Sequence, residues 1–107
     1  MAVHTKGVRD MPMYVGLYTM TEKGAGDIKK APERMREAIK AWEAMGGTTR
    51  VVVATIGKYD YVSVGEAPSD EVAAAFAAAL TSQGFVTTET LRGFTPEEFA
   101  GVLAKLP

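Results

Sequence analysis

The densest group of side chains that could do chemistry is the run Gly57-Lys58-Tyr59-Asp60. In a functional interpretation, Asp60 is a general base and Tyr59 donates a hydrogen bond to a developing oxyanion at the mouth of a cavity. The same run also fits a hairpin turn, because glycine permits unusual dihedral angles and an aspartate bonds to its own backbone. The turn already explains each residue type, so it is the favoured interpretation.

Glu89 and Arg92 are the other candidates, and both belong to a β-rich stretch near the end of the chain. A carboxylate inside a strand is unusual, and Glu89 is the best general acid or base of the chain if it faces a cavity together with Tyr14 or Tyr18. Alternatively, it lies at an edge or pairs with Arg50 or Arg92. Arg92 could hold an anionic group of a ligand, or clamp a carboxylate such as Asp60 or Glu66.

Composition excludes many other kinds of site. The chain has 107 residues with no cysteine and one histidine, so it has no thiolate nucleophile, no cysteine-ligated metal and no pair of imidazoles. The histidine, His4, belongs to an aperiodic stretch and is a poor ligand for haem or metal. No phosphate-binding glycine loop or calcium loop is present. We therefore expect no cofactor and no metal.

Charge and hydropathy limit the partners and the location. Twelve Lys and Arg residues against 13 Asp and Glu residues give a net charge of -1, which offers no reason to bind nucleic acid or an anionic membrane. The sequence contains neither the apolar core of a signal peptide nor a run long enough to span a membrane. We therefore expect a cytoplasmic location, with no nucleic acid and no membrane as partners.

The periodicity of apolar residues predicts the elements that position these side chains. Residues 13–20, 48–56, 61–66 and 85–92 are rich in β-branched and aromatic residues and predict strands. A helix is expected over about residues 27–45, with Asp27 as a candidate cap and Pro32 as a point of restart. Ser69 or Asp70 begins a second helix, and Thr95, Pro96 and Glu98 begin a third. The apolar positions Phe99, Val102, Leu103 and Leu106 give the third helix its buried side.

The order of these elements is βαββαβ followed by a helix. It predicts an α+β, ferredoxin-like fold, in which a four-stranded antiparallel sheet carries both main helices on one face. Residues 1–12 are predicted to form an N-terminal tail, and residues 13–107 a single domain.

The face of the sheet away from the helices is expected to be too apolar for a monomer in water. We assign to this face a tyrosine-rich set of side chains, namely Tyr14, Tyr18, Met20, Val52, Ala54, Ile56 and Tyr61. A partner subunit, a bound ligand or the C-terminal helix could cover it. The favoured cover is a second copy of the chain, which predicts a homodimer or a higher homo-oligomer.

The ordered combination of motifs resembles the GYD domain family of small bacterial proteins. The motifs that carry the resemblance are Gly57-Lys58-Tyr59-Asp60, Glu66-Ala67-Pro68-Ser69-Asp70 and Leu91-Arg92-Gly93-Phe94-Thr95. The resemblance implies a ferredoxin-like fold of the dimeric α+β barrel kind. It implies no single activity, because this fold also occurs in monooxygenases, isomerases, haem-handling enzymes and ligand-sensing domains.

The preferred functional prediction is a homo-oligomer that holds a small apolar or aromatic molecule between sheet and helices. The predicted ligand-binding residues are Tyr14, Tyr18, Met20, Tyr61 and Arg92. One alternative is a cofactor-independent isomerase, cyclase or monooxygenase that uses Glu89 and Asp60 as catalytic groups. Another is a structural or regulatory assembly module that has no ligand.

Overall fold

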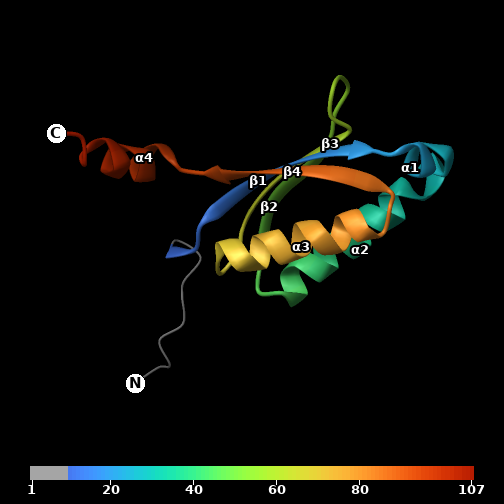
Figure 1. The fold of residues 1–107 in the computed structure, drawn as a ribbon, viewed down its shortest axis with the longest axis horizontal. Coiled ribbons are helices and arrows are strands. Elements are labelled where there is room, and N and C mark those ends of the chain that lie inside the picture. Colours follow the sequence, from blue (N-terminus) through green and yellow to red (C-terminus); the bar gives the residue numbers. More distant parts are fainter. Residues whose placement is uncertain (1–9) are drawn as a thin grey trace.

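A four-stranded antiparallel sheet organises the structure, a computed structural model that describes residues 10–107 (Figure 1). The spatial order of its strands is β2-β3-β1-β4. The strands are β1 (Met13–Met20), β2 (Thr48–Ala54), β3 (Tyr61–Glu66) and β4 (Val86–Gly93). The long helices α2 (Ala31–Ala44) and α3 (Asp70–Ser82) both lie against one side of this sheet. The predicted α+β, ferredoxin-like arrangement is therefore confirmed.

Most of the predicted N-terminal tail, including His4, lies outside the described residues. Within the described part, Met11 is buried, and the carbonyl oxygen of Pro12 accepts a hydrogen bond of 3.1 Å from the backbone N–H of Ala67. The boundary at residue 12 stays a prediction.

The segment between β1 and α2 contains more helix than its sequence indicates. A short helix, α1 (Glu22–Gly26), is capped by the side chain of Thr21 and is followed by a 3-10 turn, η2 (Ile28–Lys30). Asp27, the predicted cap, makes no capping side-chain hydrogen bond. The helix α1 has only five residues, and two of them are glycines, which disfavour helix, so its sequence shows no helical pattern.

The helix α3 begins where the sequence predicts, because the Ser69 hydroxyl accepts a hydrogen bond from the backbone N–H of Val72. Phe76 of α3 packs edge-on against Trp42 of α2, with 5.0 Å between ring centroids. The indole N–H of Trp42 in turn donates to the carbonyl oxygen of Thr48 at the start of β2, at 2.8 Å. These contacts attach both helices to the same face of the sheet.

The C-terminal helix α4 (Pro96–Leu103) has the predicted N-terminus, with a capping box formed by Thr95 and Glu98. It extends away from the sheet beyond the end of β4 (Figure 1). The prediction that its apolar side is buried is wrong for the single chain, because that side makes no extensive contact with another element. Its large apolar side chains are between 40% and 68% exposed, namely Phe99, Val102, Leu103 and Leu106.

We predict that Gly24→Ala destabilises the fold, whereas Gly26→Ala in the same helix does not. A Cβ atom at Gly24 would lie 2.2 Å from the backbone carbonyl oxygen of Phe85, and backbone cannot move aside cheaply. A Cβ atom at Gly26 would meet no heavy atom within 4 Å. We expect Gly24→Ala to cost about 1–3 kcal/mol of unfolding free energy, measured by urea denaturation. Equal stability of the two variants would contradict the close packing of α1 on residue 85.

Candidate functional site

A small cavity lies between the sheet and the helices α2 and α3. Its volume is about 90 Å³, below the range of about 300–1,000 Å³ that is typical of small-molecule pockets. The predicted ligand-binding residues among its lining are Tyr14, Tyr18, Met20 and Tyr61. The structure thus brings four of the five predicted ligand-binding residues to one place, and it leaves Arg92 outside the lining.

These tyrosines lie on the opposite face of the sheet from the one we assigned to them. Alternation along β1 groups Tyr14, Gly16, Tyr18 and Met20 correctly, but the group faces the helices and not the uncovered side. Alternation identifies which side chains share a face, and it cannot tell which face the helices cover. Here the ring of Trp42 on α2 packs against that of Tyr14, so α2 covers the face of the sheet that carries the tyrosines.

Tyr14 of the cavity contacts both long helices. Its hydroxyl donates a hydrogen bond to a carboxylate oxygen of Asp70 in the first turn of α3, and its ring packs edge-on against Trp42, with 6.4 Å between centroids. Burial, followed by the hydrogen bond to Asp70, raises the pKa of Tyr14 from 10.0 to about 12. Tyr14 is therefore a neutral hydrogen-bond donor that connects β1 to α3, and a poor proton donor for catalysis near neutral pH.

Tyr18 lies beside a glycine that makes room for it. Its hydroxyl is 2.9 Å from the hydroxyl oxygen of Ser63 on β3, and a Cβ atom at Gly16 would come within 2.2 Å of the Tyr18 hydroxyl oxygen. Burial raises the pKa of Tyr18, and the hydrogen bond with Ser63 partly opposes this shift. The close approach accounts for the small residue at position 16 inside a strand.

Asp60 does not line the cavity, and its polar groups hold backbone together. Its Oδ2 accepts a hydrogen bond of 2.7 Å from the backbone N–H of Met20, and its own N–H donates to the carbonyl oxygen of Tyr18 at 2.8 Å. The carbonyl oxygen of Asp60 accepts from the N–H of Thr55 at 2.9 Å. This pattern agrees with the turn interpretation of the Gly57-Lys58-Tyr59-Asp60 run, in which Gly57 has a φ of +119°.

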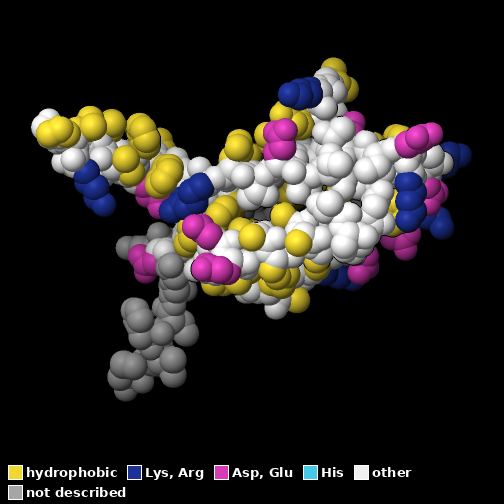
Figure 2. Space-filling model, in the orientation of Figure 1, with side chains coloured by type: hydrophobic (Ala, Val, Ile, Leu, Met, Phe, Trp, Pro, Cys, Tyr) yellow, Lys and Arg dark blue, Asp and Glu magenta, His cyan; other side chains and the backbone are white. Residues whose placement is uncertain are grey.

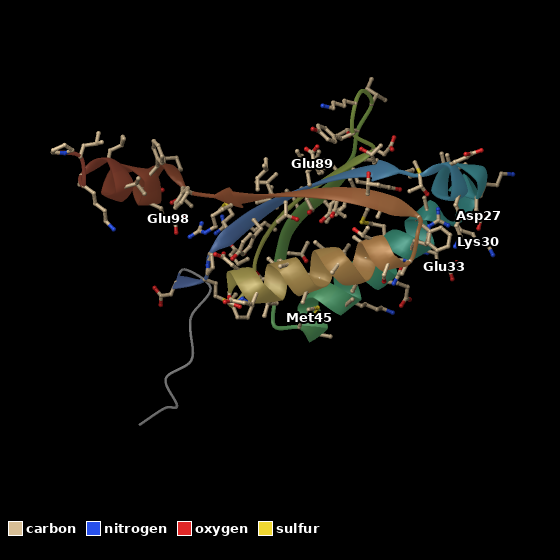
Figure 3. All side chains as sticks on the ribbon, in the orientation of Figure 1. Asp27, Lys30, Glu33, Met45, Glu89 and Glu98 are labelled. Carbon is tan, nitrogen blue, oxygen red and sulfur yellow. The ribbon has the colours of Figure 1, made fainter. Side chains whose placement is uncertain are left out.

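Glu89 lies across the sheet from the cavity. It pairs in register with Leu17, which alternates with the cavity-lining residues of β1, and Figure 3 shows Glu89 on the side opposite α2 and α3. Its side chain is exposed, and Oε2 accepts a hydrogen bond of 2.9 Å from the hydroxyl of Tyr59. The predicted combination of Glu89 with Tyr14 or Tyr18 in one pocket is therefore not formed in this chain. The catalytic roles of Glu89 and Asp60 stay predictions.

Arg92 stacks against aromatic rings and clamps no carboxylate among the described residues. Its guanidinium lies 4.5 Å from the ring centroid of Phe94 and 5.9 Å from that of Tyr14. The clamp on Glu66 is made instead by Arg50, whose Nε bonds to a carboxylate oxygen of this buried residue. Either arginine could have been chosen from the sequence, because only the register decides which one comes near Glu66.

The side of the sheet that the helices leave uncovered, which we call the open face, carries other residues than those assigned to it from the sequence. Its side chains alternate with those that line the cavity, and the pairing register places them together. The apolar members of the open face are Val15, Leu17, Val51, Val53, Val62, Val64 and Leu91. Val51 and Val53 are 45% and 44% exposed, and Leu91 is 49% exposed. An exposed group of this kind is typical of an interaction surface.

The described residues contain neither a metal-binding cluster nor a helix that could span a membrane. Residues 10–107 contain no cluster of three or more acidic or histidine side chains with the arrangement of a metal site. Over the same residues, each helix is too short or too polar to cross a bilayer.

We predict that the stabilising contribution of the Tyr14 hydroxyl depends on pH in the alkaline range. Because the pKa of Tyr14 is raised from 10.0 to about 12 in the folded chain, its neutral form stabilises the fold fully below pH 10, and this contribution is lost as the pH rises towards 12. At neutral pH, Tyr14→Phe should lower the unfolding free energy by about 2 kcal/mol, since the hydrogen bond to a carboxylate is lost. Chemical denaturation of both proteins as a function of pH measures the difference. A difference that stays constant throughout would contradict the assignment.

Comparisons with known proteins agree with the fold and with the motifs. The model of the GYD domain family matches residues 14–103. A protein of Thermus thermophilus, named glutamine synthetase and cystathionine beta-lyase binding protein, is 40% identical over 83 residues, which cover 76% of this chain and 86% of the relative. No solved structure gives a significant match. With the matching fold and the matching motifs in place, the chain belongs to the GYD domain family.

Proposed function

We propose that this chain is a protein-binding module that works as a homodimer assembled through its open face. The observation that carries the proposal is the exposed apolar surface formed by Val51, Val53 and Leu91 on an otherwise well-formed sheet. Two antiparallel sheets commonly pack face to face about 10 Å apart, with their apolar side chains interdigitated. An isologous contact of this kind uses the same patch twice and needs no second binding surface.

The binding of other proteins is supported by the relative and by the small size of the cavity. The Thermus thermophilus protein is named for its binding to glutamine synthetase and cystathionine beta-lyase. In this chain, a cavity of about 90 Å³ offers little room for a substrate, and the candidate carboxylate Glu89 lies on the other face of the sheet. We therefore propose one or both of these enzymes as partners. The expected cytoplasmic location, where such enzymes would be met, stays a prediction.

The dimer predicts that a charge on the open face prevents association. Val53→Glu places a carboxylate within the proposed interface, on the edge strand β2, where burial of an unpaired charge is costly. Ala78→Glu introduces the same side chain at an exposed position of α3 and serves as the matched control. Light scattering should give the mass of two chains for the unmodified protein and for Ala78→Glu, and that of one chain for Val53→Glu. Association of Val53→Glu equal to that of the control would exclude this interface.

Binding of the partner enzymes predicts a measurable complex. Purified glutamine synthetase and cystathionine beta-lyase from the organism that encodes this chain are immobilised separately, and the unmodified chain is passed over each in an interferometry experiment. We expect saturable binding to at least one enzyme. Absence of saturable binding to both enzymes would contradict the proposed partners.

A small ligand in the cavity is the second candidate function. The observation that favours it is the shared lining by Tyr14, Tyr18, Met20 and Tyr61. An apolar cavity of about 150 Å³ is sufficient for benzene in another protein, so only a molecule of that size or smaller is a candidate here.

The second candidate predicts that benzene raises the thermal unfolding midpoint. Ala38 of α2 lines the cavity, whereas Ala41 of the same helix is exposed, so Ala38→Leu should abolish the increase and Ala41→Leu should preserve it. Differential scanning calorimetry measures the midpoints. An unchanged midpoint of the unmodified chain at saturating benzene would exclude binding of this aromatic probe.

A further inference from the structure

The helix α4 presents an apolar stripe that its own chain leaves exposed. Phe99, Val102, Leu103 and Leu106 have the spacing of three and four residues that places side chains on one face of a helix. Figure 2 shows hydrophobic side chains gathered along this helix. Near its base, the ring of Phe94 packs on that of Phe99 with 6.3 Å between centroids. We call residues 94–106 the C-terminal arm.

A helix of this length needs a surface to pack on. The arm contains eight helical residues, and isolated helices shorter than about 12–15 residues are marginally stable in water. The capping box of Thr95 and Glu98 contributes about 1 kcal/mol, which does not replace packing. The helix of the arm is therefore expected to pack on a surface outside its own chain.

The connection to the sheet directs the arm away from its own open face. Only Phe94 and Thr95 lie between the last residue of β4 and the first helical residue, Pro96. Thr95 is extended, with φ −67° and ψ 162°, and the chain leaves the sheet without turning back.

A second exposed apolar projection lies at the other end of the sheet. The loop of residues 55–60 joins β2 to β3 and stands on the side of the open face (Figure 1). Its Ile56 is fully exposed and its Lys58 is exposed. In the register of β1, the loop adjoins the end at Tyr18, which pairs with Tyr61, whereas the arm adjoins the end at Met13, which pairs with Gly93.

Two-fold symmetry brings these two projections to the same end of the stacked open faces only for some directions of the axis, of which two limiting cases differ clearly. If the axis runs along the strands, both arms lie at one end of the stacked sheets and both loops at the other, so no arm lies near a loop. If the axis is instead close to perpendicular to the strands, each arm lies at the same end of the stack as the loop of the other copy, and a tilt of the axis offsets the different edges from which β4 and the loop project. There Lys58 is opposite in charge to Glu97 and Glu98 of the first turn of α4, and Ile56 offers an apolar contact. In the second arrangement, the two-fold symmetry forms two equivalent contacts, and each covers one arm and one loop.

We propose that the C-terminal arm packs on the loop of residues 55–60 of a second copy of the chain. This inference rests on the proposed dimer of open faces and specifies its alignment, with the strands of the two sheets running in opposite directions from arm to loop. Each dimer then contains two equivalent contacts between an arm and a loop, and these contacts lie at opposite ends of the stacked sheets.

Disulfide cross-linking tests this contact directly, since the chain contains no cysteine of its own. The variants Ile56→Cys and Leu103→Cys are purified, mixed in equal amounts, allowed to exchange subunits and oxidised. The products are separated on a non-reducing gel, and a disulfide between the two variants is identified by mass spectrometry. We expect this product at more than tenfold the yield obtained when Ile56→Cys is replaced by Ala78→Cys, which is exposed on α3 and remote from the arm in the proposed dimer.

The outcomes distinguish a failure of the arm contact from a failure of the dimer. If the unmodified chain has the mass of two chains but the Ile56–Leu103 product does not exceed the control, the proposed arm contact is wrong and the open-face dimer stands. Efficient cross-linking of Leu103→Cys with itself would show arm against arm and would also overturn the inference. If the chain has the mass of one chain at all concentrations, both the dimer and the arm contact are wrong.

Discussion

The contact of Tyr14 with Trp42 and Asp70 determines which face of the sheet is covered. Tyr14 lies on a central strand, its ring packs on a residue of α2, and its hydroxyl bonds to the first turn of α3. Both long helices are therefore fixed to the same side. The opposite side of the sheet is left for a partner to cover, and it carries the apolar group that contains Val51, Val53 and Leu91.

The contacts of the Gly57-Lys58-Tyr59-Asp60 run are those of a structural turn and not those of a catalytic site in the cavity. Asp60 ties the end of the β2–β3 loop to β1 through the backbone of Tyr18 and Met20. Tyr59 reaches across to Glu89 and fixes the loop above the open face. A loop held by side chains at both ends can present Ile56 and Lys58 in a defined position, as a docking element requires.

Much of the fold could be predicted from local signals. Ser69 and Thr95 begin their helices as predicted, because a hydroxyl at a cap satisfies a backbone donor whatever the rest of the chain does. The orientation of β1 could not be predicted, since alternation is symmetric between two faces until Trp42 packs on one of them. The burial of the C-terminal helix was expected from its apolar stripe, but such a stripe shows only that a surface is needed and not which chain supplies it.

The central claim is that the open face is covered by a second copy in solution, and hydroxyl-radical footprinting measures this coverage directly. Leu91 on the open face and Ile28 in η2 have similar exposure in the single chain, at 49% and 55%. If the open faces associate, oxidation of Leu91 relative to Ile28 falls several-fold as the protein concentration is raised and recovers on dilution. A ratio that matches the similar exposures and does not change with concentration would contradict the account.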